Sequence, residues 1–272
     1  MLTWIIVCIA TGVIGMSSIG LSGFLPRVEE EEICCGCNQC NTCIGRRKIG
    51  RDSNLLSECM LLTYWMVGKK CEHIHKTSAL IRIIYFIINA CIVSVLFWSG
   101  ESNLECIVSG ITAAMLLALG VVDWNTQYIP AEYTCIIFLC GLIHLFADFS
   151  NWSQYLIGLI AVSGFLCIVN WIATPILRKQ YGDDEIDSVI GDGDIKLMAA
   201  TGLLLGWKLN FIALGIGCIA GSVIHLILMK VKGSGRQFAF GPYLSLGVYI
   251  TMICGEQLVS WYLNILGVNT LL

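Results

Sequence analysis

Two aspartates are the residues of this chain best suited to chemistry. Asp123 follows the apolar run 104–122, and Asp194 closes the Gly-Asp-Gly-Asp sequence at 191–194, where another apolar run begins. Ionisable side chains at membrane depth are costly and usually functional. When two carboxylates approach each other, sharing one proton is easier than ionising both, and such a pair can activate water against a peptide carbonyl. The two residues are therefore candidates for an aspartyl peptidase pair.

Helix capping is the alternative interpretation of the same two residues. Asp123 would cap a helix at the membrane interface and Asp194 would be the N-cap of the next helix, where Asp is favoured. Charge placement by itself favours this capping interpretation. Gly191 and Gly193 favour the catalytic interpretation, because glycine permits positive φ and lets the backbone approach a substrate closely.

The composition places these aspartates in a membrane protein. Of the 272 residues, 57% are hydrophobic and 13% are charged, whereas soluble domains average about 25% charged residues. Such a chain cannot bury its apolar residues in one water-soluble core, which excludes both a soluble globular enzyme and a disordered chain. The net charge of −3 gives no general attraction for nucleic acid, and we expect no nucleic-acid partner.

Continuous apolar runs predict an all-α polytopic membrane protein, since helices satisfy their own backbone hydrogen bonds in a lipid bilayer. We expect a first transmembrane helix over 1–25, retained because no basic residues precede it, a Cys-rich cytoplasmic loop over 26–78, and a multi-helix core over 79–272. The sixth run is about 20 Å long, which is short for a bilayer core of about 30 Å. The eight expected spans are 2–25, 79–98, 104–122, 130–148, 153–176, 195–207, 209–229 and 240–266.

The basic residues predict the orientation of these spans. Nine of the 16 Lys and Arg residues lie between Arg27 and Arg82, and cytoplasmic loops carry an excess of such residues. A cytoplasmic 26–78 loop also puts the basic residues that follow the fifth and seventh spans on the cytoplasmic side. Asp123 and Asp194 then lie near the same, cytoplasmic, face of the membrane.

Three segments together resemble the prepilin peptidases, a family of membrane aspartyl peptidases of the GxGD type. Residues 191–200 resemble the family's GxGD-x-K-L-x-A-A segment, and residues 123–130 resemble its first aspartate segment, D-x-x-x-x-x-x-P. Residues 240–244 resemble its late F-G-P-x-L segment. The segments follow the family's order, and the family's layout of eight spans agrees with the spans expected here.

The resemblance implies an endopeptidase that cuts the basic leader from type IV prepilins or pseudopilins. Cleavage would occur at the cytoplasmic face of the bacterial cytoplasmic membrane and would need no cofactor. Asp123 and Asp194 would be the catalytic pair, and Lys196 would adjust their protonation or hold the substrate. The residues implied to shape the site are Gly191, Gly193, Lys196, Pro130, Phe240, Gly241 and Pro242.

The predicted cytoplasmic loop contains seven of the 15 cysteines, in C-x-x-C spacing that is typical of zinc sites in a reducing compartment. In bifunctional members of the family this loop carries two C-x-x-C pairs, in a region also needed for N-methylation of the new N-terminus with S-adenosylmethionine. Cys40 and Cys43 resemble the first pair. Cys71 resembles the start of the second, but the next Cys is missing, and His73 or His75 would complete a zinc site. Free thiols remain the alternative, and this departure leaves methyltransferase activity open.

Two other classes of function remain open from the sequence. A transporter or ion-conducting protein would use Asp123, Asp194 and Lys196 as a relay, but it leaves the 240–242 segment unexplained. A catalytically inactive relative would act in the assembly of a pilus or secretion system. The retention of both aspartate segments argues against this inactive relative.

Overall fold

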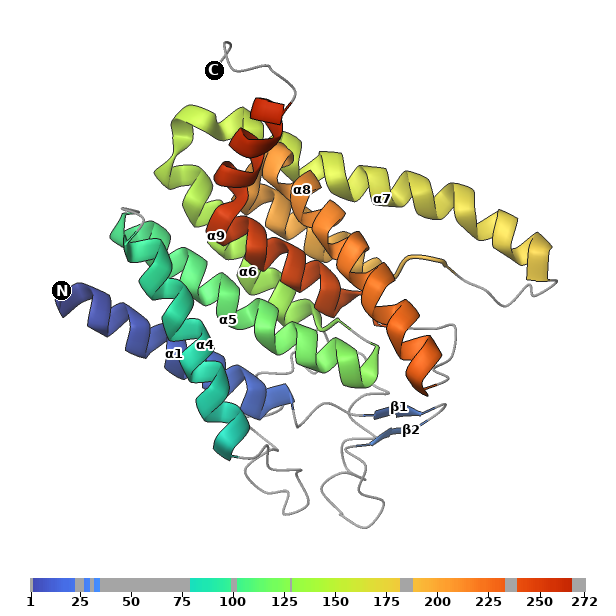
Figure 1. The fold of residues 1–272 in the computed structure, drawn as a ribbon, viewed down its shortest axis with the longest axis horizontal. Helices are drawn as coiled ribbons and strands as arrows, with labels where there is room; N and C mark the ends of the chain where they lie inside the picture. Colours follow the sequence, from blue (N-terminus) through green and yellow to red (C-terminus); the bar gives the residue numbers. More distant parts are fainter. Residues whose placement is uncertain are drawn as a thin grey trace, which may run out of the picture.

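The computed structural model describes residues 2–22, 27–29, 32–34, 79–98, 102–127, 129–181, 188–232 and 239–265, and these form a helical bundle (Figure 1). The predicted helical membrane architecture is confirmed. A 3-10 turn at Phe149–Asn151 joins two of the helices. The helices are α1 (Leu2–Ser22), α4 (Ala79–Trp98), α5 (Asn103–Thr126), α6 (Ala131–Ala147), α7 (Trp152–Tyr181), α8 (Asp192–Lys232) and α9 (Gly241–Ile265).

A short antiparallel ribbon lies within the predicted loop 26–78. Strand β1 (Arg27–Glu29) pairs with strand β2 (Glu32–Cys34). Among the described residues, no cluster of three or more His, Cys, Asp or Glu side chains could hold a metal ion. The four predicted zinc ligands lie outside the described residues, and their site stays a prediction: Cys40, Cys43, Cys71 and His73.

The surface of the bundle is apolar, as lipid requires. Large hydrophobic side chains such as Trp171 and Ile160 are exposed on α7, which in water would be an aggregation hazard. Three segments of the described chain are long and apolar enough to cross a membrane: Asn103–Trp124, Phe149–Gln180 and Asp192–Lys230. Shorter apolar helices are Trp4–Ile14, Phe86–Trp98 and Ala131–Ala147.

The chain reverses direction inside α8, at Gly206. In an unbroken helix Met198 and Asn210 would be separated by about 18 Å. Instead, Asn210 Nδ2 donates a hydrogen bond to the Met198 carbonyl oxygen at 2.8 Å, and Thr201 Oγ1 donates to Asn210 Oδ1 at 3.0 Å. Gly206 makes the turn with φ 74° and ψ 170°, a conformation that favours glycine. The predicted sixth and seventh spans therefore correspond to two arms of α8 that lie side by side.

Backbone contact holds the first arm of α8 against α7. A Cβ atom added at Gly158 would overlap the carbonyl oxygen of Gly202, and a Cβ atom at Gly202 would overlap the carbonyl oxygen of Gly158. Small residues allow membrane helices to approach this closely. The contact leaves no space for a side chain at either position.

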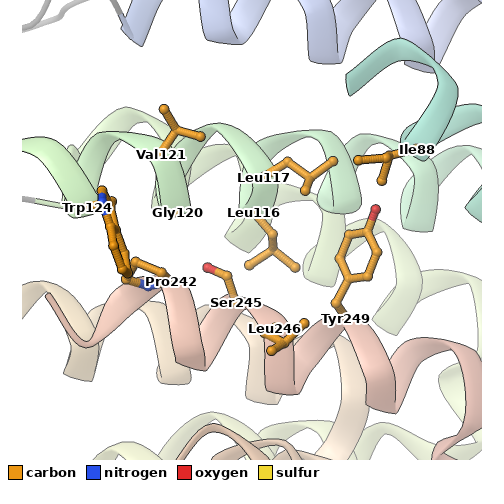
Figure 2. Close-up of a pocket in the computed structure, with 10 residues that line it drawn as sticks. All are labelled: Ile88, Leu116, Leu117, Gly120, Val121, Trp124, Pro242, Ser245, Leu246 and Tyr249. Atoms are coloured by element: carbon orange, nitrogen blue, oxygen red, sulfur yellow. The ribbon is translucent and has the colours of Figure 1, made fainter. Parts of the chain in front are cut away.

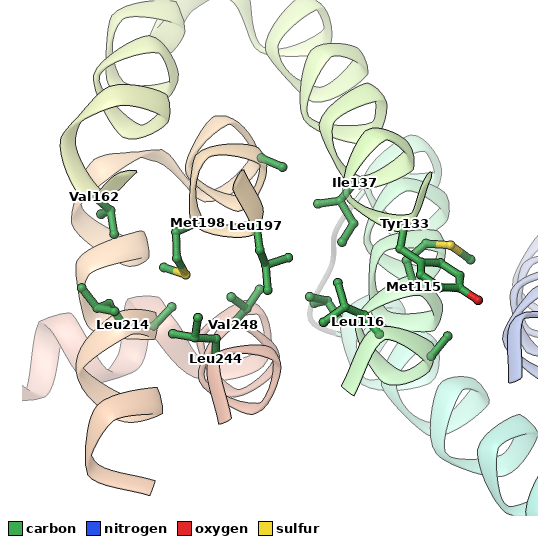
Figure 3. Packing of buried hydrophobic residues seen from close by; sticks show 14 of the residues in the cluster. Met115, Leu116, Tyr133, Ile137, Val162, Leu197, Met198, Leu214, Leu244 and Val248 are labelled. Atoms are coloured by element: carbon green, nitrogen blue, oxygen red, sulfur yellow. The ribbon is translucent and has the colours of Figure 1, made fainter. Parts of the chain in front are cut away.

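The main hydrophobic core lies between α5, α6, α8 and α9, and Val162 of α7 also belongs to it (Figure 3). Leu116, Ile137, Leu197 and Leu244 come from these four helices in turn and are completely buried. Tight packing of this kind resists small displacements. The core therefore fixes the ends of α5, α8 and α9 relative to one another.

The glycine contact makes a prediction about stability. We expect Gly158→Ala to lower the free energy of unfolding by about 1–3 kcal/mol, because the new methyl group forces α7 and α8 apart. The matched control is Gly164→Ala on the same helix, where no atom lies within 4 Å of the added Cβ. Circular dichroism during thermal unfolding in detergent measures the unfolding midpoint of each variant. Equal midpoints for the two variants would contradict the contact.

Candidate active site

Asp123 lies in the last turn of α5, which continues beyond the predicted end of the span at residue 122. The helix ends at Gln127, which adopts the left-handed conformation with φ 53° and donates its backbone N–H to the Asp123 carbonyl oxygen at 2.8 Å. The Asp123 side chain is 4% exposed. The helix end thus holds a buried carboxylate in a fixed position.

The Asp123 carboxylate joins α5 to α9. Its Oδ2 atom accepts a hydrogen bond of 2.8 Å from the backbone N–H of Gly241, the first residue of α9. A Cβ atom at Gly241 would lie 2.7 Å from the same oxygen, so glycine is required for this approach. The capping interpretation is therefore partly right, but Asp123 caps α9 and not its own helix.

Asp194 lies in the first turn of α8 and is 8% exposed. The backbone N–H groups of Asp194 and Ile195 both donate to the Gly191 carbonyl oxygen, at 3.1 and 3.3 Å. Gly191 therefore occupies the N-cap position, and the capping interpretation of Asp194 is wrong. The Oδ1 atom of Asp194 is buried and has no hydrogen-bond partner among the described residues. An unpaired buried carboxylate oxygen is costly and calls for a functional explanation.

The structure brings the two carboxylates into one site. Asp123 and Asp194 interact electrostatically, although 71 residues separate them. Ile129 lies between Gly193 in the first turn of α8 and Gly241 at the start of α9: its Cβ would be 2.7 Å from a Cβ added at Gly193, and its Cδ1 would be 3.1 Å from a Cβ added at Gly241. The three segments that carry the sequence resemblance therefore meet at the same place.

Two helix N-termini converge on this carboxylate pair. Asp123 accepts from the first N–H of α9, and Asp194 lies in the first turn of α8. The positive end of a helix dipole stabilises a nearby negative charge. This arrangement offsets part of the repulsion between two buried carboxylates and requires no cationic side chain.

The other predicted site residues surround the pair in different ways. Pro130 is buried and is the N-cap of α6, and Phe240 is half-buried against the main core. A Cβ at Gly191 would lie 3.3 Å from Asp194 Oδ2, and Pro242 lines a neighbouring cavity. Lys196 is exposed and, within the described part of the chain, forms no ion pair with either aspartate. Its predicted role stays a prediction.

Sequence reasoning missed an apolar groove beside Asp123 (Figure 2). It has a volume of about 540 Å³ and lies between α4, α5 and α9. Trp124 and Pro242 line its end nearest Asp123, and Ser245 and Tyr249 line the part that follows along α9. The hydroxyl groups of Ser245 and Tyr249, one helical turn apart, were the only signal available in the sequence.

Helical membrane spans and a buried carboxylate pair define this chain as a polytopic membrane protein with a carboxylate-based site. The family model described as "Type IV leader peptidase family" matches residues 110–226, which include both aspartates. Residues 110–226 thus belong to the type IV leader peptidase family, as the resemblance predicted.

Proteins named "Prepilin leader peptidase/N-methyltransferase" are similar over longer stretches. The protein of Legionella pneumophila is 28% identical over 61% of this chain and 56% of its own length. The protein of Aeromonas hydrophila is 31% identical over 55% of this chain and 50% of its own length. The protein of Pseudomonas putida is 24% identical over 89% of this chain and 81% of its own length. In the first two matches the chain spans about half the length of its relative. No solved structure matches the chain.

The bond between Asp123 and Gly241 makes a second stability prediction. We expect Asp123→Ala to cost about 1–3 kcal/mol, because it leaves the buried Gly241 N–H without an acceptor. Asp123→Asn keeps an oxygen that can accept this hydrogen bond, so its free energy of unfolding should fall by less. Asp192→Ala, at an exposed position on α8, is the control for removing an aspartate. Unfolding in detergent measures all three, and an Ala variant as stable as the Asn variant would contradict the structural role of the bond.

Proposed function

We propose that this protein is a membrane aspartyl endopeptidase that removes the basic leader from type IV prepilins or pseudopilins. The observation that carries the proposal is the buried pair of Asp123 and Asp194 at two converging helix N-termini. The names of the relatives and the family of residues 110–226 support this choice of substrate. Peptide cleavage by such a pair requires no cofactor.

The pair would work as one ionised and one protonated carboxylate. The base takes a proton from a water molecule, and the resulting hydroxide adds to the scissile carbonyl carbon while the acid protonates the carbonyl oxygen. As this intermediate collapses, the carboxylate left by the acid takes a proton back from one of the two hydroxyl groups of the intermediate, the C–N bond breaks, and the base passes its proton to the leaving amine. The pair thereby returns to one ionised and one protonated carboxylate. We assign the base to Asp123, whose Oδ2 already accepts a backbone N–H, and the acid to Asp194, whose Oδ1 has no partner.

The proposal includes an orientation in the membrane. The described residues contain eight helical segments when the two arms of α8 are counted separately, and we propose that these are the eight spans. With the basic loop 26–78 in the bacterial cytoplasm, Asp123 and Asp194 lie at the cytoplasmic face of the inner membrane. A basic leader reaches them there before it is removed. The surrounding lipid bilayer is the other partner, and the proposal includes no nucleic acid.

N-methylation, the second activity considered for this chain, would involve a loop that lies mostly outside the described residues. The relatives are named as N-methyltransferases as well as peptidases. In this chain, methylation of the new N-terminus with S-adenosylmethionine would involve the loop 26–78 and its candidate zinc ligands. We propose the peptidase activity here and treat methylation as an outcome to be measured alongside it.

A cleavage assay tests the peptidase. The protein is co-expressed with a prepilin from the same source, and the product is followed by mass spectrometry. We expect leader removal by the wild type and a loss of at least 100-fold in both Asp123→Asn and Asp194→Asn, since each removes one half of the acid–base pair. The same spectrum shows whether the new N-terminus carries a methyl group. Cleavage that persists in either variant would overturn the two-aspartate mechanism.

Gly241→Ala tests the geometry of the site without removing a carboxylate. The added methyl group would displace the Asp123 carboxylate, so we expect cleavage to fall by at least tenfold, since small misplacements of reacting groups cost this much. The control is Gly215→Ala in α8, where the added Cβ meets no atom within 4 Å. If Gly241→Ala cleaves as fast as Gly215→Ala, the Asp123–Gly241 contact is not part of the active site.

A further inference from the structure

The apolar groove beside Asp123 runs along α5 and α9, from Trp124 and Pro242 at one end to Tyr249 and Ile88 at the other (Figure 2). One wall is α5 from Leu117 to Trp124, and the other is α9 from Pro242 to Tyr249. Each wall covers seven residue steps, or about 10 Å. Because α5 ends where α9 begins, the two walls are antiparallel and both extend away from the site.

The groove is open along its rim and closed at its floor. Leu246 and Trp124 on the rim are 41% and 53% exposed, whereas Leu116 on the floor is completely buried. A Cβ added at Gly120 would be in van der Waals contact with the Cα of Pro242, at 3.6 Å, so the glycine leaves a space of one methyl group between the two walls at that point. A segment lying in the lipid could therefore enter the groove from the side.

Two polar atoms interrupt the apolar lining. The Ser245 Oγ and Tyr249 hydroxyl oxygens are buried and have no hydrogen-bond partner among the described residues. Ser245 is only 5% exposed. Both hydroxyls belong to residues that line the groove, and Figure 2 shows them on the side of α9 that faces α5.

The Ser245 hydroxyl lacks the bond to its own helix backbone that other Ser and Thr hydroxyls on α9 make. Within a helix a Ser or Thr side chain commonly donates to the carbonyl oxygen four residues earlier. Ser260 and Thr251 on α9 do so, with bonds of 2.8 and 2.9 Å to Glu256 and Gly247. Ser245 makes no such bond to Gly241 and leaves its hydroxyl available to an occupant of the groove.

A peptide substrate brings the groups that such hydroxyls need. Proteolysis requires the backbone near the cut bond to leave its helix, which frees N–H and C=O groups that find no partner in lipid. Ser245 and Tyr249 lie one and two turns along α9 from Gly241, about 6 and 12 Å. An extended chain that starts at the aspartates covers this length in about four residues.

We propose that the groove seats the apolar segment that follows the cleavage site in the substrate, and that the Ser245 and Tyr249 hydroxyls bind its unwound backbone. This inference rests on the proposed peptidase function and names the part of the substrate that the groove recognises. An acyl chain of a lipid would fill the apolar volume but would leave both hydroxyls unpaired, because it carries no hydrogen-bonding group. The two residues are positioning residues and take no part in proton transfer.

Photo-crosslinking tests the occupant of the groove directly. A photoreactive amino acid replaces Leu246 on the rim of the groove, in a chain that also carries Asp194→Asn so that the full-length prepilin stays uncleaved. The matched control places the same amino acid at Trp261, on the same helix, where the side chain is 62% exposed. We expect position 246 to crosslink to the first residues after the leader, and position 261 to crosslink to lipid or not at all.

Steady-state kinetics tests the two hydroxyls. We expect the double variant Ser245→Ala, Tyr249→Phe to raise KM for the full-length prepilin by roughly tenfold, from the loss of two neutral hydrogen bonds, with a smaller change in kcat. The control is Ser260→Ala, Tyr262→Phe, which makes the same chemical changes on α9 away from the groove. Equal kinetics of the two double variants would overturn the role of the hydroxyls.

The outcomes separate this inference from the function on which it rests. If the wild type cleaves prepilin but position 246 crosslinks only to lipid, or no more to prepilin than position 261 does, the groove proposal fails and the peptidase stands. If the wild type leaves prepilin uncleaved while folded and inserted, both fail. Cleavage together with a crosslink specific to position 246 supports both.

Discussion

A carboxylate buried among membrane helices needs hydrogen-bond donors that the fold itself supplies, because lipid offers none. Asp123 finds its donor in the backbone N–H of Gly241, at the start of α9. This bond fixes the end of α5 against the beginning of α9, and these two helices form the long walls of the groove. The site and the groove therefore depend on one carboxylate that is structural as well as chemical.

The second carboxylate depends on a different constraint. Asp194 is carried by the first arm of α8, which is held by backbone contact with α7 at Gly158 and Gly202 and by the side chain of Asn210 from the second arm. The first contact is between backbones, and in the second the Asn210 side chain is fixed by hydrogen bonds to the Met198 carbonyl oxygen and to Thr201. Asp194 thus belongs to a rigid unit, while Asp123 belongs to the unit formed by α5 and α9.

Local sequence patterns predicted the elements of this structure better than their contacts. Apolar runs predicted the helices, and the Gly-Asp-Gly-Asp sequence marked the start of α8, because both signals lie within a few neighbouring residues. Gly241 was implied only through the resemblance of its segment, and its role as donor to Asp123 depends on tertiary packing across 118 residues. The capping interpretation failed at Asp194 because Gly191 accepts the first helical hydrogen bonds. The groove was missed because hydroxyls in a helix usually bond to their own backbone.

The long sequence separation between Asp123 and Gly241 has a consequence for biogenesis. At a synthesis rate of about 5–20 residues per second, roughly 6 to 24 s pass between the emergence of the two residues from the ribosome. During that interval α5 can already be in the membrane, but its terminal carboxylate lacks its backbone donor, and the second wall of the groove does not yet exist. A partly inserted chain would therefore lack both the completed carboxylate site and the second wall of the groove until α9 docks.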